Sequence, residues 1–201
     1  MVNSVDFFGP DGLAEAVPAD LRKDLIFLID SGWDVPYGTV NAQDMKFGSL
    51  AADARRFPET AALPPAEKLA LLSNEFKRRG WKGIGIWVAA HENDTLLSGD
   101  AQREHWSRKL EESKTAGVLY WKVDWGKHMY DIDFRRLLTE LGREIYPELW
   151  LEHALVPSGH LNDGKGEGRF NEPVSLTSAA GQLTYTDVFR TYDCTWSISN
   201  S

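Results

Sequence analysis

Five short apolar runs recur along this chain of 201 residues, and each of them ends in or just before an acidic residue. Helical patterns of about four turns separate most of these runs. Strands that alternate with helices in this way favour right-handed βαβ units around a parallel sheet. The runs are 24–30, 83–92, 118–124, 149–152 and 187–193, and they end at Asp30, Glu92 (after His91), Asp124, Glu152 and Asp193.

Three segments between the runs have the apolar periodicity of amphipathic helices. Residues 65–79 open with a proline at a favoured first-turn position and stop at Gly80. Residues 100–116 have Asp100 as a plausible cap and Gly117 just beyond, and residues 131–145 end before Pro147. The tract 156–183 is rich in glycine, proline and polar residues, which predicts a long loop.

Two α/β architectures fit this order: a doubly wound open sheet and a TIM (β/α)8-type barrel. The open sheet favours a glycine-rich phosphate loop after an early strand, and neither GxGxxG nor GxxxxGK[ST] occurs. A barrel places its chemistry at the carboxyl ends of several strands, as the acidic residues do here. We therefore predict a single barrel domain over residues 1–201.

The length indicates that this barrel is incomplete, because a full one needs about 250 residues. Residues 4–8, "SVDFF", are the only candidate for its first strand. We expect five or six βα units, in a fragment of a longer product or a shortened relative. Such a chain depends on a missing C-terminal segment or on forming a homo-oligomer.

Composition excludes several classes of function. The net charge of −8 gives no electrostatic footprint for nucleic acid or an anionic membrane. No apolar run approaches the ~20 residues of a membrane span, and the first residues do not resemble a signal peptide. A cytoplasmic location is the default expectation. The single cysteine excludes an internal disulfide framework.

Lys122 and Asp124 stand two residues apart at the end of a predicted strand, so their side chains point to the same side. A neighbouring ammonium group favours the ionised carboxylate and lowers its pKa. An ionised carboxylate is a good nucleophile towards an acetal carbon. Asp193, from another strand end, is the partner acid/base, because retaining glycosidases use two carboxyl groups about 5–5.5 Å apart. The alternative for each single aspartate is a cap of the following helix.

Four segments also resemble the retaining α-galactosidase clan, glycoside hydrolase families 27 and 36. "YWKVDWG" is similar to the strand in which a K-x-D triplet carries the nucleophile, and "FLIDSGW" to the strand that reads I-D-D-G-W or I-D-D-C-W. "FKRRGWKGIGIW" resembles the third strand of these enzymes, and "VFRTYD" the sixth. The resemblance covers residues 24–196.

The resemblance implies a glycoside hydrolase with a retaining mechanism and a glycoside or oligosaccharide substrate. By position, Asp124 is the nucleophile and Asp193 the general acid/base. It implies no metal and no organic cofactor. The implied substrate-binding residues are Asp30, Trp33, Trp87, Lys122, Glu152 and Arg190.

This chain departs from the clan at Ser31, where a second aspartate is usual. That difference leaves the sugar open between galactose, glucose and a pentopyranose such as arabinose. Two further functions also stay open. One is a catalytically inert sugar-binding fragment, and the other is a metal-dependent barrel enzyme with the ligands His91, Glu92, Glu152 and His153.

Overall fold

The computed structural model describes residues 2–39, 44–129, 131–154 and 184–189 of the chain. Within these residues, five strands form one sheet in the order β1-β2-β3-β4-β5, and all neighbouring pairs are parallel. The strands confirm the predicted α/β class. Their bounds are Ile26–Ile29 (β1), Gly83–Val88 (β2), Val118–Val123 (β3), Trp150–His153 (β4) and Val188–Phe189 (β5).

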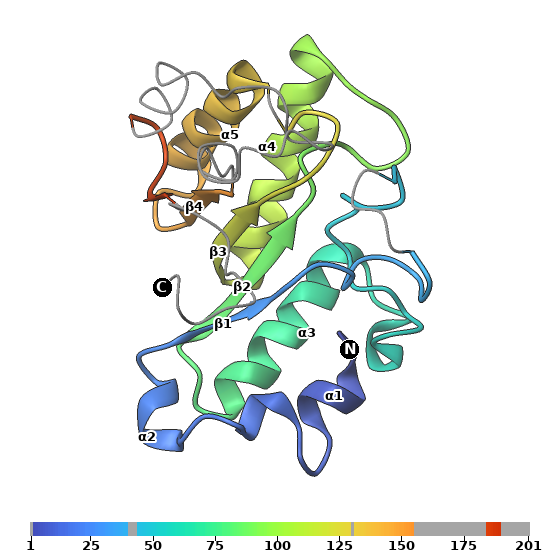
Figure 1. Ribbon diagram of the computed structural model, residues 1–201, viewed down its shortest axis with the longest axis vertical. Coiled ribbons are helices and arrows are strands. Elements are labelled where there is room, and N and C mark those ends of the chain that lie inside the picture. Colours follow the sequence, from blue (N-terminus) through green and yellow to red (C-terminus); the bar gives the residue numbers. More distant parts are fainter. Residues whose placement is uncertain (1, 40–43, 130, 155–183, 190–201) are drawn as a thin grey trace, which may run out of the picture.

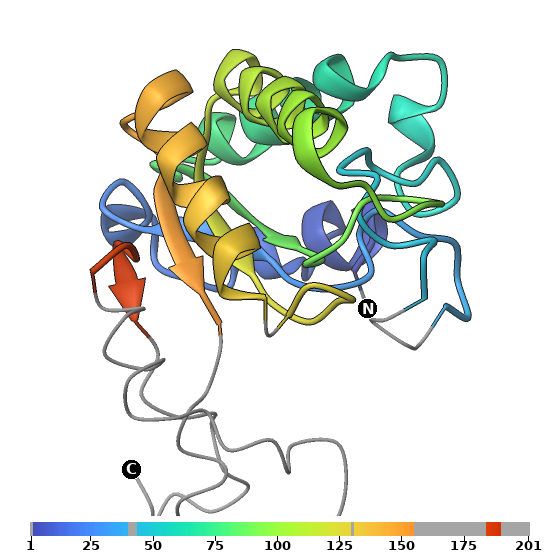
Figure 2. The same ribbon diagram turned by 90° about the horizontal axis from the view of Figure 1, so that it is seen from above.

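Three long helices connect the first four strands: α3 (Pro65–Arg78), α4 (Gly99–Ala116) and α5 (Ile132–Ile145). They lie together on one side of the sheet (Figures 1 and 2). A doubly wound fold has helices on both faces and a reversal of strand order. The sequential order with helices on one face is instead that of part of a TIM-barrel-like domain. The described strands form an open sheet, so barrel closure remains a prediction.

Local signals in the sequence set most helix ends. Pro65 is the first residue of α3, and Asp131 caps α5 by accepting a hydrogen bond from the backbone N–H of Phe134 at 3.0 Å. Gly117 ends α4 with φ of 67°, which a glycine adopts without strain. The prediction that Asp100 caps α4 was wrong, because the helix begins at Gly99 and Ser98 is the capping residue.

The segment 4–8 is not a strand, which corrects our prediction. It forms the short helix α1 (Ser4–Phe8), because the Asn3 side chain accepts a hydrogen bond from the backbone N–H of Asp6 at 2.9 Å. The ring of Phe7 then packs against Phe27 of β1 at 5.3 Å. The other short helices are η1 (Leu13–Glu15), α2 (Ala19–Arg22) and η2 (Pro58–Thr60).

Aromatic rings fill the layer between the sheet and the long helices. Phe27 of β1 stacks on Phe76 of α3 at 4.2 Å, and Trp121 of β3 meets Trp106 of α4 edge to face at 6.1 Å. The opposite face of the sheet is less covered, since Trp150 is 59% exposed. This second face, which we call the inner face, carries the candidate site. No helix in the described ranges is long and apolar enough to cross a membrane.

Candidate functional site

Four predicted site residues lie side by side in one row across the inner face. The strand register pairs Trp87 of β2 with Lys122 of β3, and Lys122 with Glu152 of β4. Asp30 follows Ile29, which pairs with Ile86, and so it continues the row on β1. The intervening residues point to the helices, as the Trp121 indole does when it donates to Ser113 Oγ of α4 at 3.2 Å.

Asp124 lies just beyond this row, at the carboxyl end of β3. Its Oδ2 accepts a hydrogen bond from Trp87 Nε1 at 3.1 Å and lies 3.6 Å from Lys122 Nζ. Its backbone N–H donates to the carbonyl of Val88 at 2.9 Å, and the residue is only 7% exposed. An indole N–H and an ammonium group on the same oxygen stabilise an ionised carboxylate in this dry position.

Lys122 connects this carboxylate to a second one. Its Nζ lies 3.0 and 3.2 Å from the two carboxylate oxygens of Asp30 and 3.6 Å from Oδ2 of Asp124. Asp30 is the exposed member of the three. The lysine therefore holds two carboxylates from different strands at one edge of the sheet.

The side chain of Glu152 is held in place by a hydrogen bond from Tyr120 of β3. The Tyr120 hydroxyl donates to Glu152 Oε2 at 2.5 Å, and the carboxylate is almost fully buried. Gly85 provides the room for this arrangement, since a Cβ atom at residue 85 would lie 2.9 Å from Cβ of Tyr120. Glu152 therefore presents a fixed carboxylate beside Lys122.

Trp33 lies behind the row and not at its surface. Its side chain has no exposed area, and its indole donates to the backbone carbonyl of Trp87 at 2.9 Å. In this structure Trp33 supports the strand that carries Trp87. Arg190 and Asp193 lie outside the described residues, as does the predicted loop 156–183, so their roles stay predictions.

Arg135 is a structural residue that the sequence analysis missed. It is completely buried on α5 and donates to the carbonyls of Val123 at 2.7 Å, Asp124 at 2.8 Å and Met129 at 3.1 Å. Burial lowers the pKa of Arg135 to about 10, which leaves the guanidinium charged at neutral pH. This side chain fixes the backbone at the end of β3, and hence the position of Asp124.

A second buried cluster surrounds Glu92, after β2. Its carboxylate accepts hydrogen bonds from Trp106 Nε1 at 2.7 Å, Gln102 Nε2 at 3.2 Å and the backbone N–H of Leu97 at 3.1 Å, and it lies 3.2 Å from His128 Nε2. Burial alone raises the pKa of Glu92, but the bonds from His128, Trp106 and Leu97 outweigh it and lower that pKa to about 2. The Glu92 carboxylate in turn raises the pKa of His128.

The four ligands of the metal-dependent alternative do not gather. Glu152 lies on the inner face, while His153 points to α5, where Thr139 Oγ1 lies 2.8 Å from its Nε2. Burial and the nearby Arg135 hold the pKa of His153 well below its usual range. No group of three or more histidine, cysteine, aspartate or glutamate residues with metal-site geometry occurs in the described part of the chain.

Comparison with known proteins identifies a similar fold among solved structures, and it shows no family for the chain. No protein-family model and no curated protein matches the chain. Among solved structures, it resembles a family GH27 β-L-arabinopyranosidase from Geobacillus stearothermophilus at 14% identity and a TM-score of 0.55, over 89% of this chain and 48% of that one. An aspartate-to-alanine variant of the same enzyme in complex with arabinose matches at 14% identity and a TM-score of 0.52, over 89% and 49%.

The similarity therefore identifies the fold. The chain shares this fold with the GH27 structures and spans about half the length of the solved structures it matches.

Proposed function

We propose that this chain carries the nucleophile half of a retaining glycoside hydrolase site, with Asp124 as the nucleophile. The observation that carries the proposal is the carboxylate of Asp124 at a strand end, held by Trp87 at 3.1 Å and Lys122 at 3.6 Å. A nucleophilic carboxylate must be ionised and fixed in direction, and these two contacts supply both conditions.

The reaction is a double displacement. A carboxylate oxygen of Asp124 forms a bond to the anomeric carbon while the bond from that carbon to the leaving oxygen breaks. Asp193 donates the proton to the leaving oxygen, then takes a proton from the water that hydrolyses the glycosyl-enzyme. Both steps use carboxyl chemistry alone, so the mechanism requires no cofactor. The resemblance of "YWKVDWG" and "VFRTYD" to strands of the α-galactosidase clan supports this assignment of roles.

Asp30, Lys122 and Glu152 are the proposed ligands of the sugar hydroxyl groups. They offer two carboxylates and one ammonium group along the inner face, next to Asp124. Ser31 stands where the clan has a second acidic residue, which weakens the case for galactose. The solved neighbour is a β-L-arabinopyranosidase, which supports a pentopyranose as the first sugar to test.

The test is intact-mass measurement and peptide mapping after incubation with cyclitol epoxides or aziridines in the arabino, galacto and gluco configurations. We expect one adduct on Asp124 and none in Asp124→Asn. The matched control is Asp133→Asn, since the side chain of Asp133 is 94% exposed on α5 and outside the row. It should label as the wild type does.

An adduct on another carboxylate would overturn the assignment of Asp124. The absence of any adduct on folded protein that still binds a sugar saturably would instead identify an inert sugar-binding chain. Absence of both labelling and sugar binding would contradict the glycosidase proposal as a whole.

A further inference from the structure

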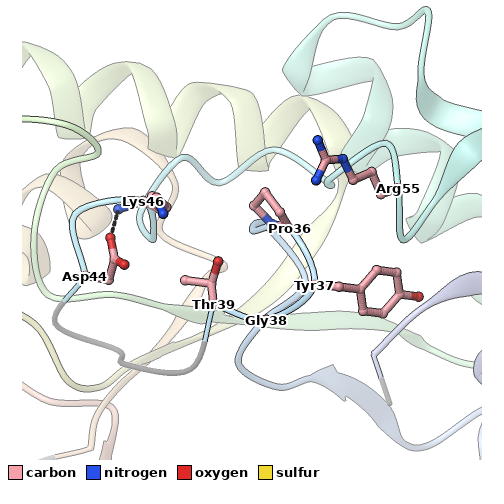
Figure 3. A pocket seen from close by; sticks show the side chains of 7 residues that line it. All are labelled: Pro36, Tyr37, Gly38, Thr39, Asp44, Lys46 and Arg55. Carbon is pink, nitrogen blue, oxygen red and sulfur yellow. Dashed lines mark hydrogen bonds between the residues drawn. The ribbon is translucent and has the colours of Figure 1, made fainter.

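A cavity of about 450 Å³ lies in the connection between β1 and α3, away from the row of site residues. The residues that matter for its chemistry are Tyr37, Thr39, Asp44, Lys46 and Arg55. Tyr37 lies at one side of the cavity, Asp44 and Lys46 at the other, with Thr39 between them (Figure 3). The connection starts at Asp30, so it leaves the sheet at the edge where the candidate site lies.

Arg56 holds the aromatic side of this cavity in place. It is buried, and it donates to the carbonyls of Val35 at 2.5 Å and Pro36 at 3.3 Å. Its guanidinium carbon lies 4.4 Å from the centroid of the Tyr37 ring. The ring is nevertheless 46% exposed, so a fixed aromatic surface remains open to solvent. Such a ring can pack against the apolar face of a sugar.

The charged side chains around the cavity sum to an excess of one positive charge. Lys46 and Arg55 are exposed cations, and neither forms an ion pair within the described part of the chain. Asp44 is the opposing carboxylate, and its Oδ1 accepts a hydrogen bond from the backbone N–H of Lys46 at 3.0 Å. A positive cavity on a chain of net charge −8 favours an anionic group there.

The short stretch of chain between Asp30 and Tyr37 sets an upper limit on the distance from the candidate site to the cavity. Tyr37 is seven residues beyond Asp30, so the two lie at most about 25 Å apart. Gly32, two residues beyond Asp30, lies close to Arg56, because a Cβ atom at residue 32 would lie 3.8 Å from a guanidinium nitrogen of that side chain. The candidate site and the cavity are therefore joined by one short stretch of chain.

We infer that this cavity binds a carboxylate-bearing sugar unit. The inference rests on the proposed function for the class of ligand, a sugar, while the binding of a carboxylate stands on the cavity itself. Tyr37 supplies the packing surface, and Lys46 and Arg55 bind the carboxylate. At the sugar hydroxyl groups Thr39 donates or accepts hydrogen bonds, and Asp44 accepts them.

The test is calorimetric titration of the chain with digalacturonate and with its neutral dimethyl ester. We expect the acid to bind about fivefold more tightly at low salt, the scale of an exposed charge pair, and the difference to vanish in 1 M salt. Lys46→Gln and Arg55→Gln should each reduce the preference for the acid. Tyr37→Ala should weaken both ligands.

The control is Lys23→Gln, an exposed lysine paired with Asp24 on another part of the surface. It should leave the preference unchanged. Equal binding of acid and ester, no binding of either, or an equal effect of Lys23→Gln would overturn the inference. Cyclitol labelling of Asp124, measured on the same variants, should be unaffected. If labelling fails while the preference for the acid persists, the proposed function fails and the acidic-sugar site stands.

Discussion

The indole of Trp87 donates a hydrogen bond of 3.1 Å to the carboxylate of Asp124 from the neighbouring strand. Both residues are buried, at 2% and 7% exposure. The contact joins the ends of β2 and β3 at the inner face. It makes the orientation of Asp124 depend on the register between the two strands.

Trp87→Phe removes this donor and retains most of the ring. We expect cyclitol labelling of Asp124 to slow by about 10- to 100-fold, because a hydrogen bond to a charged group contributes about 1.5–3 kcal/mol. The rate of adduct formation by intact mass is the measurement. Trp81→Phe is the matched control, since it removes the equally buried bond from Trp81 Nε1 to the Ala14 carbonyl at 2.8 Å. Equal slowing in both variants would show a general loss of packing.

Arg135→Met should both destabilise the fold and slow the labelling. It removes the bonds to the carbonyls of Val123, Asp124 and Met129, so we expect a loss of at least about 3 kcal/mol in the free energy of unfolding. Urea unfolding and labelling rate are the two measurements. Arg136→Met is the control, because Arg136 is half-exposed and forms a 3.6 Å pair with the exposed Asp133 and a long contact of 6.0 Å to the Tyr185 ring. An unchanged labelling rate in folded Arg135→Met would remove the positioning role.

Much of this arrangement could be predicted from local sequence. Alternating apolar runs and helices identify the parallel sheet, and the spacing of Lys122 and Asp124 places both on one face. The contact between Trp87 and Asp124 could not be predicted, because it depends on the register of two strands, including a shift between Ile84 and Gly85.

Two errors have local causes. The segment "SVDFF" has strand-forming residues, but the cap at Asn3 and the packing of Phe7 favour a helical turn. Arg135 stands next to Phe134 in an amphipathic helix and looks like a surface residue in the sequence. Its three carbonyl partners come from the end of β3, which only the folded chain brings near.

Gly85→Ala should be more costly than the same change at Gly83 on the same strand. A Cβ at residue 85 meets the Cβ of Tyr120 at 2.9 Å, which cannot move without the backbone, whereas one at residue 83 meets the flexible end of Leu119 at 2.7 Å. We expect Gly85→Ala to lower the free energy of unfolding by about 1–3 kcal/mol. Gly83→Ala should cost less, and urea unfolding of both variants is the measurement. The opposite order would show that Tyr120 is not held against β2.

The pair formed by Glu92 and His128 should make its largest contribution to the stability of the fold in weak acid. The pKa of His128 is raised above 6.5, so its contribution is complete below that pH and is lost as the pH rises through the higher folded value. The pKa of Glu92 falls from 4.5 to about 2, so its contribution is present above pH 4.5 and is lost towards pH 2. Both contributions are present together between pH 4.5 and 6.5.

His128→Gln should therefore destabilise the chain most within that window, and less at pH 8–9. Urea unfolding across pH 4.5–9 measures the difference from wild type. His105→Gln is a control of opposite sign, because burial lowers the pKa of His105 and protonation opposes folding there. Its cost should shrink as the pH falls below 6.5. A cost of His128→Gln that is constant with pH would show that the imidazole only fills space against Phe134, on which it stacks at 4.7 Å.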